Sequence, residues 1–461
     1  HNGELNTIRG NVNWMRAREN DLESQTFDAE EVTPVVADPE GSDTAAVDNS
    51  LELLLQGGRD LPHALRLMVP EAWRKDDQMA EERKEFYDFH ASLLEPWDGP
   101  ALVAATDGER VGAVLDRNGL RPCRYDVTTD GLLVMASEAG ALDTDESEIR
   151  ERGRLEPGQL FLADPDEGRV VPDEEVFADL TDDRYGEWVE REQVGLDAAA
   201  DSAGDPRASA TPDARLDASL RERQTAFGYT RDELDRMLEP MAEEGKDPVG
   251  SMGDDTPLSV LSSFDRPLFS YFKQLFAQVS NPPIDYLRED CVTSLESRLG
   301  NQRNLLAESP AHARQLVLDS PVLTDAEMTE VREQDRIPTA TVDATYAPET
   351  DLETALRRVR EETSEAVKSG AEILVLSDRE VGPDRVAIPS LLATGAVHHH
   401  LVRRGLRNRT GLLVESGDPR TVHHLACLVG YGAGAVNPTL AFESIADIAA
   451  GPDGADEAAA I

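Results

Sequence analysis

Lysine is nearly missing from this chain. Of its 461 residues, 45 are Lys or Arg and 91 are Asp or Glu, only five of the basic residues are Lys, and the formal net charge is −46. Scarce Lys beside abundant carboxylate is typical of halophilic proteins, because salt at 1 M shortens the Debye length to about 3 Å and screens self-repulsion. The acids lie among regular apolar segments, which favours a folded acidic surface over a disordered tail. Nucleic acid is excluded as a partner, since its phosphates require positive charge.

Cysteine is also scarce. Cys123, Cys291 and Cys427 lie far apart and form no CxxC pair, which predicts a reducing cytoplasm and no zinc or iron–sulfur site in this chain. No apolar run approaches the roughly eighteen residues that span a bilayer, so we expect no membrane segment. The chain opens at His1 without a basic-then-apolar signal layout, and we expect it to be a piece of a longer protein.

One stretch without large apolar residues divides the chain. Residues 198–215 are mostly Ala, Asp, Pro, Ser and Gly, a composition that predicts a linker. We therefore place a first domain at residues 1–197, an acidic linker at 198–216 and a second domain at 217–461.

The two regions have different patterns. In the first, helical segments at 60–67 and 80–94 precede apolar runs at 101–105, 111–115, 132–136 and 159–163. Turn pairs such as Asp107-Gly108 separate these runs, which predicts antiparallel strands. In the second, helices at 352–369, 390–404 and 418–429 alternate with strands at 373–376 and 412–414, which predicts a parallel sheet with crossover helices.

The opening His1-Asn2-Gly3-Glu4 has two interpretations. Asn-Gly is a common turn, and it can also place an amide side chain beside a backbone N–H, as an oxyanion hole requires. The segment HNGELNTIRGNVNWMRARE resembles part of the class II glutamine amidotransferase domain of the glutamate synthase family. The resemblance continues through GRDLPHALRLMVPEAW, DRNGLRPCRY, ASEAG, LEPGQLFLAD, FDRPLFSYFKQLFAQVSNPPIDYLRED, RLGNQRNLL and GYGAGAVNP. The matches after residue 260 argue against the sugar-phosphate and purine amidotransferases.

This resemblance implies an α/β plus α+β fold: an incomplete Ntn-hydrolase αββα sandwich, then an α/β central domain with a parallel sheet. Members of the family hydrolyse glutamine and pass the ammonia to 2-oxoglutarate, which makes glutamate. In the matching motifs, Asn2 and the backbone N–H of Gly3 form the oxyanion hole, and Asp43 binds the α-amino group of glutamine. Asp43, within Gly-Ser-Asp-Thr, also has the alternative role of a helix N-cap.

The chain departs from the family pattern at the nucleophile. Family members use an N-terminal cysteine, and no cysteine precedes the oxyanion motif here. We interpret Cys123 as structural. We therefore expect this chain alone to hold the oxyanion and glutamine-binding half of a glutaminase site and to be inactive. The alternative is a non-catalytic scaffold or regulatory module derived from the enzyme.

The resemblance also implies partners and cofactors. The partners are glutamine, the flavin domain of the large subunit, and a small electron-donating subunit or ferredoxin. FMN and an iron–sulfur cluster belong to the downstream flavin domain, so we expect this chain to bind no cofactor. No metal ligands are predicted, because the consecutive residues His398, His399 and His400 would point about 100° apart on a helix. Gly430–Ala435 follows a helix, which is the wrong order for a dinucleotide-binding loop, and it predicts a turn.

Overall fold

The computed structural model describes residues 2–38, 40–196, 219–246, 248, 260–261, 263, 266–273 and 289–458. The chain divides into two compact units. Unit 1 comprises His1–Gln193, Pro283–Ser294 and Gln302–Arg314, and unit 2 comprises Val194–Pro282, Leu295–Asn301 and Gln315–Ile461. The linker predicted at 198–216 lies outside the described residues, so the domain boundaries drawn from the sequence stay predictions.

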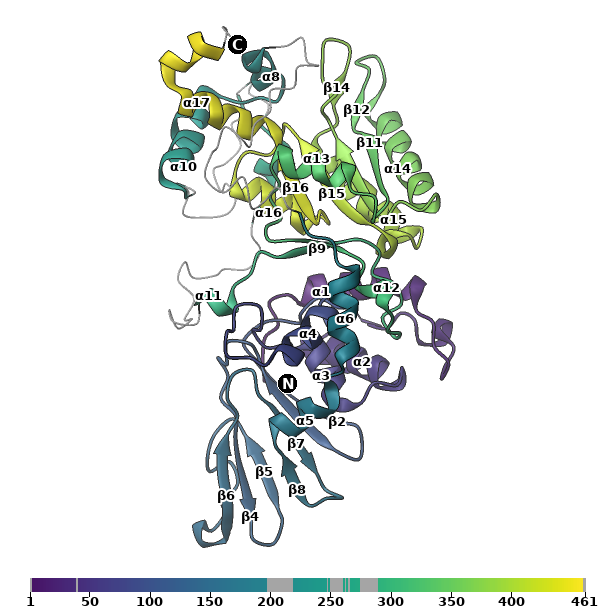
Figure 1. The fold of residues 1–461 in the computed structure, drawn as a ribbon, viewed down its shortest axis with the longest axis vertical. Helices are drawn as coiled ribbons and strands as arrows, with labels where there is room; N and C mark the ends of the chain where they lie inside the picture. The colour runs from purple at the N-terminus through teal and green to yellow at the C-terminus, as the bar shows by residue number, and fades with distance from the viewer. Residues whose placement is uncertain are drawn as a thin grey trace. The chain divides into compact units, whose positions relative to one another are not determined.

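Unit 1 combines helices with antiparallel sheets (Figure 1). Its helices are α1 (Ile8–Arg18), α2 (Asp43–Gln56), α3 (Leu61–Met68), α4 (Glu81–His90), α5 (Asp173–Leu180), α6 (Asp183–Glu192), α11 (Glu289–Val292) and α12 (Pro310–Ala313). Its strands are β1 (Asn2–Gly3), β2 (Ala101–Thr106), β3 (Val111–Leu115), β4 (Arg124–Thr128), β5 (Leu133–Ala136), β6 (Ile149–Arg154), β7 (Leu160–Asp164) and β8 (Arg169–Val171).

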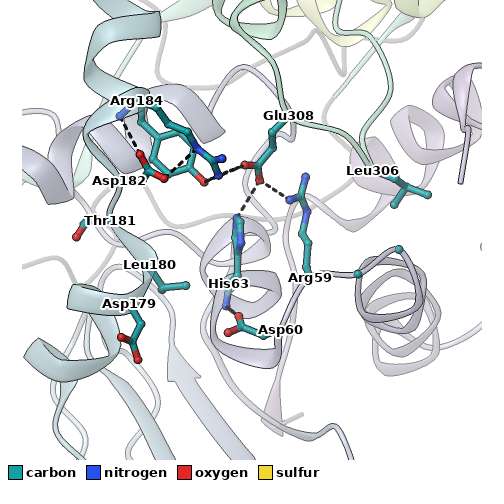
Figure 2. Close-up of a pocket in the computed structure, with 13 residues that line it drawn as sticks. Arg59, Asp60, His63, Asp179, Leu180, Thr181, Asp182, Arg184, Leu306 and Glu308 are labelled. Atoms are coloured by element: carbon teal, nitrogen blue, oxygen red, sulfur yellow. Dashed lines mark hydrogen bonds and ion pairs between the residues drawn. The ribbon is translucent and has the colours of Figure 1, made fainter. Parts of the chain in front are cut away.

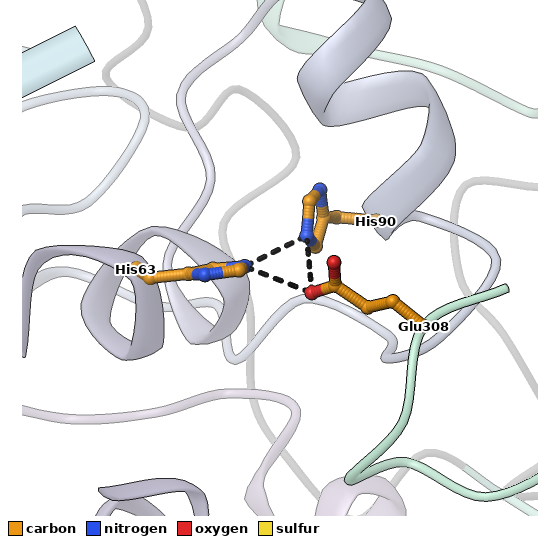
Figure 3. Close-up of side chains that lie close together, drawn as sticks. All are labelled: His63, His90 and Glu308. Atoms are coloured by element: carbon orange, nitrogen blue, oxygen red, sulfur yellow. Dashed lines mark hydrogen bonds and ion pairs between the residues drawn. The ribbon is translucent and has the colours of Figure 1, made fainter. Parts of the chain in front are cut away.

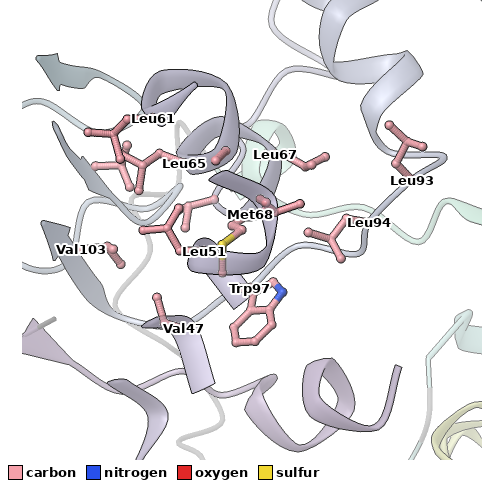
Figure 4. Packing of buried hydrophobic residues seen from close by; sticks show 14 of the residues in the cluster. Val47, Leu51, Leu61, Leu65, Leu67, Met68, Leu93, Leu94, Trp97 and Val103 are labelled. Carbon is pink, nitrogen blue, oxygen red and sulfur yellow. The ribbon is translucent and has the colours of Figure 1, made fainter. Parts of the chain in front are cut away.

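The strands of unit 1 form two sheets, with orders β1-β2-β3-β7-β8 and β5-β4-β6, and all the pairings are antiparallel. Leu102, Ala113 and Phe161 on one face of the larger sheet belong to the same apolar cluster as residues of the smaller sheet. The opposite face packs on helices. Figure 4 shows Leu51 of α2 and Leu65 of α3 in one cluster with Val103 of β2. Unit 1 therefore contains a helix layer and two facing sheets, held by two apolar cores.

Unit 2 is built on a parallel sheet of order β11-β13-β15-β16. Its strands are β9 (Ser297–Leu299), β10 (Leu316–Leu318), β11 (Thr339–Asp343), β12 (Thr345–Tyr346), β13 (Ile373–Ser377), β14 (Val386–Ala387), β15 (Gly411–Ser416) and β16 (Ala435–Pro438). Its helices are α8 (Leu220–Ala226), α9 (Arg231–Glu233), α10 (Glu239–Glu244), α13 (Asp325–Glu333), α14 (Leu352–Lys368), α15 (Ser390–Arg403), α16 (Val422–Gly430) and α17 (Thr439–Ala458). Strands β13 and β15 are buried along their whole length, which is usual in a parallel sheet that is covered on both faces.

The structure confirms the antiparallel strands and the parallel sheet with its crossover helices, and it corrects two helix bounds. The helix expected at 80–94 ends at His90. The helix expected at 418–429 begins at Val422, because Thr421 caps it by accepting from the backbone N–H of His424. Asp418 instead accepts hydrogen bonds from the backbone and hydroxyl of Ser390, at the start of α15. Among the described residues, no helix combines the length and apolar character needed to cross a membrane.

Candidate functional site

The Asn-Gly segment is a short edge strand of the larger sheet. Asn2 pairs with Leu102 and Gly3 with Ala101, antiparallel. Gly3 has a φ of +137°, and a Cβ at this position would lie 1.9 Å from the carbonyl oxygen of Pro100. Only glycine fits so close a backbone approach. The strand pairing therefore fixes the backbone of the candidate oxyanion residues against the start of β2.

Asp43 lies beside this strand, although 38 positions separate it from Leu5. Its Oδ2 atom accepts a hydrogen bond of 2.9 Å from the backbone N–H of Leu5. The helix-capping role belongs to its neighbour, because the Ser42 side chain accepts from Ala45 N at 3.2 Å. Asp43 is half-buried and occupies the first turn of α2. The fold thus brings together the two motifs that the sequence analysis selected.

A buried carboxylate, which the sequence analysis did not select, supports the strand that pairs with Gly3. Asp116 Oδ1 accepts from Ala101 N at 3.1 Å and Leu120 N at 3.3 Å, and its Oδ2 accepts from Asn118 N at 3.0 Å. Burial raises the pKa of Asp116 despite these donors. A sequence signal exists, because Asp116 opens the DRNGLRPCRY segment, but an Asp two residues before Asn-Gly also fits an ordinary turn.

A second feature of unit 1 is a polar pocket of about 460 Å³ (Figure 2). It is lined by Gly57, Gly58, Arg59, Asp60, His63, Asp179, Leu180, Thr181, Asp182, Arg184, Tyr185, Leu306 and Glu308. At its inner wall, Glu308 lies between two arginines. Its Oε1 accepts from Arg59 Nη1 at 2.6 Å, and its Oε2 accepts from Tyr185 Oη at 2.9 Å and Arg184 Nη2 at 3.1 Å.

Two histidines meet beside Glu308 (Figure 3). The Nε2 atoms of His63 and His90 are 2.7 Å apart, and they lie 3.6 Å and 3.5 Å from Glu308 Oε1. Burial lowers the pKa of His63 to about 2, with the neighbouring His90 adding to the shift, and burial also lowers the pKa of His90. Burial opposes ionisation of Glu308, but His90 and Arg59 outweigh it and hold its pKa below the usual range.

The three residues of this cluster lie far apart in the sequence. His63 lies in α3, His90 ends α4, and Glu308 lies in a segment more than two hundred positions further on. No local spacing rule connects them. The histidine runs that the sequence does show do not converge: His398 accepts from Arg407 Nε at 3.0 Å, whereas His400 bonds the hydroxyl of Ser364 at 2.7 Å. Cys123 is buried in the apolar cluster between the two sheets.

Comparison with known families divides the chain into two matched segments. Residues 1–188 match the family described as glutamine amidotransferases class-II, and residues 222–459 match the glutamate synthase central domain. These matches give unit 1 a class II amidotransferase domain and unit 2 a parallel-sheet central domain.

Curated relatives are similar in sequence to this chain over nearly its whole length. The chain is 42% identical over 447 residues to the glutamate synthase [NADPH] large chain of Bacillus subtilis, covering 96% of this chain and 29% of that protein. It is 43% identical over 454 residues to the large chain of Azospirillum brasilense, covering 97% and 30%. It is 43% identical over 459 residues to ferredoxin-dependent glutamate synthase 2 of Synechocystis, covering 96% and 29%. The chain thus spans less than a third of the length of these relatives.

Proposed function

Because the chain belongs to the glutamate synthase family, we propose that it supplies the glutamine-hydrolysing part of a complete enzyme that makes glutamate from glutamine and 2-oxoglutarate. Its unit 1 is then an Ntn-hydrolase αββα sandwich, of which the described residues supply a helix layer and two antiparallel sheets. The observation that carries the proposal is the 2.9 Å hydrogen bond between Leu5 N and Asp43, since it unites the oxyanion and substrate motifs.

In this proposal, Asn2 and Gly3 stabilise the oxyanion of the tetrahedral intermediate with a side-chain amide and a backbone N–H. A donor that is already oriented before the reaction costs no reorganisation, and the loss of one donor typically lowers the rate by about 10²- to 10³-fold. Pairing of β1 with β2 supplies this orientation. Asp116 stabilises the partner strand, because its carboxylate accepts a hydrogen bond from the backbone N–H of Ala101, which pairs with Gly3.

Asp43 takes the α-ammonium group of glutamine. A carboxylate matches that charge, and charge-assisted hydrogen bonds are about twice as strong as neutral ones. Because the same carboxylate accepts from Leu5 N, it would hold both the bound substrate and the backbone two residues after the oxyanion strand. Ammonia then reaches 2-oxoglutarate at a flavin domain that lies outside this chain and holds FMN and an iron–sulfur cluster. The relatives are named as NADPH-, NADH- and ferredoxin-dependent enzymes, so any of these donors fits the proposal.

The test uses the complete protein that carries this chain. Glutamate formation is measured once with glutamine and once with ammonium as the nitrogen source. We expect Asn2→Ala to lower the glutamine-dependent rate by about 10²- to 10³-fold while the ammonium-dependent rate is retained. A complete protein that makes no glutamate from glutamine would overturn the proposal and leave the scaffold alternative. The chain alone, with no cysteine before Cys123, should release no ammonia from glutamine.

A further inference from the structure

We propose that His63, His90 and Glu308 form a binding site for one divalent transition-metal ion of the zinc type. This inference goes beyond the proposed function and does not depend on it. It replaces the expectation, drawn from cysteine spacing and the histidine runs, that the chain holds no metal ligands. Among the described residues, these three form the one group of at least three His, Cys, Asp or Glu side chains whose ligand atoms all lie within 4.8 Å of one another.

The separations between the three ligand atoms fit a single ion. The two Nε2 atoms are 2.7 Å apart, and Glu308 Oε1 lies 3.5 Å from one and 3.6 Å from the other. A point about 1.9 Å from all three atoms follows from these separations, and zinc bonds to imidazole nitrogen and carboxylate oxygen are roughly 2.0–2.2 Å long. An ion slightly out of the plane of the three atoms therefore reaches all of them (Figure 3).

The nitrogen–nitrogen distance is the one that must change. Across a tetrahedral zinc ion, two bound nitrogens lie about 3.3 Å apart, whereas His63 and His90 are 2.7 Å apart. Metal binding would replace this direct hydrogen bond and move the rings apart by about 0.6 Å. The metal-free state, in which the two histidines hydrogen-bond to each other, therefore competes with metal binding.

The groups behind the ligands are those that a metal site uses. His90 Nδ1 lies 2.6 Å from the carbonyl oxygen of Phe86, an acceptor only, so Nδ1 carries the hydrogen and Nε2 presents its lone pair. Backbone carbonyls hold metal-ligating histidines in this way. Tyr185 and Arg184 donate to Glu308 Oε2, and Arg59 donates to Oε1. Because a carboxylate oxygen has two lone pairs, Oε1 can accept from Arg59 and still bind an ion.

The pocket gives an ion both a route and a favourable charge. His63 and Glu308 line the pocket and are 15% and 14% exposed, whereas His90 lies behind them at 3%. The lining contains four carboxylates against two guanidinium groups, which favours a cation (Figure 2). Three protein ligands with an open side also leave a position for water, as in zinc sites with two His and one Glu.

The experiment uses the chain without a polyhistidine tag, purified through chelating resin and then titrated with zinc chloride or cobalt chloride. We expect one equivalent of zinc by elemental analysis and a visible cobalt absorption of four- or five-coordinate strength. His63→Asn and Glu308→Gln should each weaken zinc binding at least about tenfold. His399→Ala, which changes an exposed histidine of unit 2, is the matched control and should bind like the unmodified chain.

Two results for the unmodified chain and the first variants would overturn the site, and a third comes from Asp60→Asn. One is a cobalt spectrum of the unmodified chain that matches the hydrated ion, which requires no variant to fold. The other is zinc binding that His399→Ala removes and Glu308→Gln retains, because the ion would then lie on the histidine run. Asp60→Asn, at the pocket wall but outside the three ligands, should change zinc affinity less than about threefold; a loss as large as that of Glu308→Gln would count against these ligands.

Discussion

The backbone N–H of Leu5 donates to the Asp43 carboxylate at 2.9 Å, across 38 positions of sequence. We expect Asp43→Asn in the complete protein to raise the KM for glutamine by about 10- to 100-fold, because a hydrogen bond to a charged group contributes roughly 1.5–3 kcal/mol. The amide oxygen of Asn can still accept from Leu5, so kcat should fall much less. Steady-state kinetics with glutamine check this.

Asp48→Asn is the control for that measurement. Asp48 lies in the same helix α2 but is exposed and faces another pocket, lined by Phe27 and Val32 among others. Its kinetics should match those of the unmodified protein. An Asp43→Asn protein with unchanged KM would show that this carboxylate holds the backbone but does not contact substrate.

Gly3 tolerates no side chain. A methyl group there would meet the Pro100 carbonyl oxygen at 1.9 Å, and the φ of +137° adds strain. We expect Gly3→Ala to abolish glutamine-dependent activity, because β1 must leave its partner strand for the methyl group to fit. Gly10→Ala is a matched control: Gly10 lies in α1 with no atom within 4 Å of the added methyl. It should raise stability by about 0.5–1 kcal/mol. Denaturant unfolding and activity, measured on both variants, check the pair.

Asp378 predicts a pH dependence of stability in unit 2. Burial raises its pKa to about 7, although Ser416 and Gly417 N donate to it, and the charges of Asp418 and Glu415 add to the shift. Between the unfolded pKa of about 3.9 and the folded value, the folded state holds a proton that the unfolded state has lost. This contribution to stability is complete below about pH 4 and is lost as pH rises through 7.

Asp378→Asn keeps an acceptor for Gly417 and supplies a fixed donor to Ser416, as the protonated acid does. Relative to the unmodified chain, we expect the variant to gain on the order of 4 kcal/mol between pH 4 and pH 8. Urea unfolding across that range checks it. Glu353→Gln changes a carboxylate that is 85% exposed. The free energy of unfolding of this variant should depend on pH in the same way as that of the unmodified chain. A stability difference for Asp378→Asn that stays constant with pH would contradict the pKa argument.

The sequence predicted the elements whose apolar pattern is strong. Strand β13 is buried at every residue, and α14 begins at Leu352 and ends before Gly370, as expected. Strand β6, with sequence IRERGR, was missed because most of its residues are exposed and carry charge. This strand is formed by its backbone pairing with β4, and the pattern of apolar side chains does not predict that pairing.

In the candidate sites, the residues that lie in sequence motifs were predicted, and a residue outside any motif was not. Asn2, Gly3 and Asp43 lie in recognisable motifs, and their proximity is consistent with the family resemblance. Glu308 carries no local signal. Its role as a candidate ligand is recognised only from the structure, in which it lies beside Arg59 and His63. Long-range pairs of this kind depend on how chain segments return to a unit, which a single sequence does not show.

The return of residues 302–314 to unit 1 gives the last prediction. Leu305 is 1% exposed in the larger core of unit 1, and Arg59, whose side chain is 6% exposed, depends on Glu308 and on the Leu305 carbonyl for its hydrogen bonds. A protein that ends at residue 197 would lose this leucine and both hydrogen-bond partners of the Arg59 guanidinium. Loss of the buried leucine alone costs about 2–3 kcal/mol, a substantial share of the roughly 5–15 kcal/mol of a typical domain.

We therefore expect residues 1–197 alone to unfold at a much lower urea concentration than unit 1 does in the full chain, or to aggregate. Joining residues 302–314 to residue 197 through a flexible Gly/Ser linker should restore most of the midpoint. The matched control carries the same linker and segment with Leu305→Ala and Glu308→Ala, and it should restore little. If residues 1–197 alone unfolded at the same urea midpoint as the full chain, residues 302–314 would not stabilise unit 1. The domain predicted from the sequence to end at residue 197 would then fold independently.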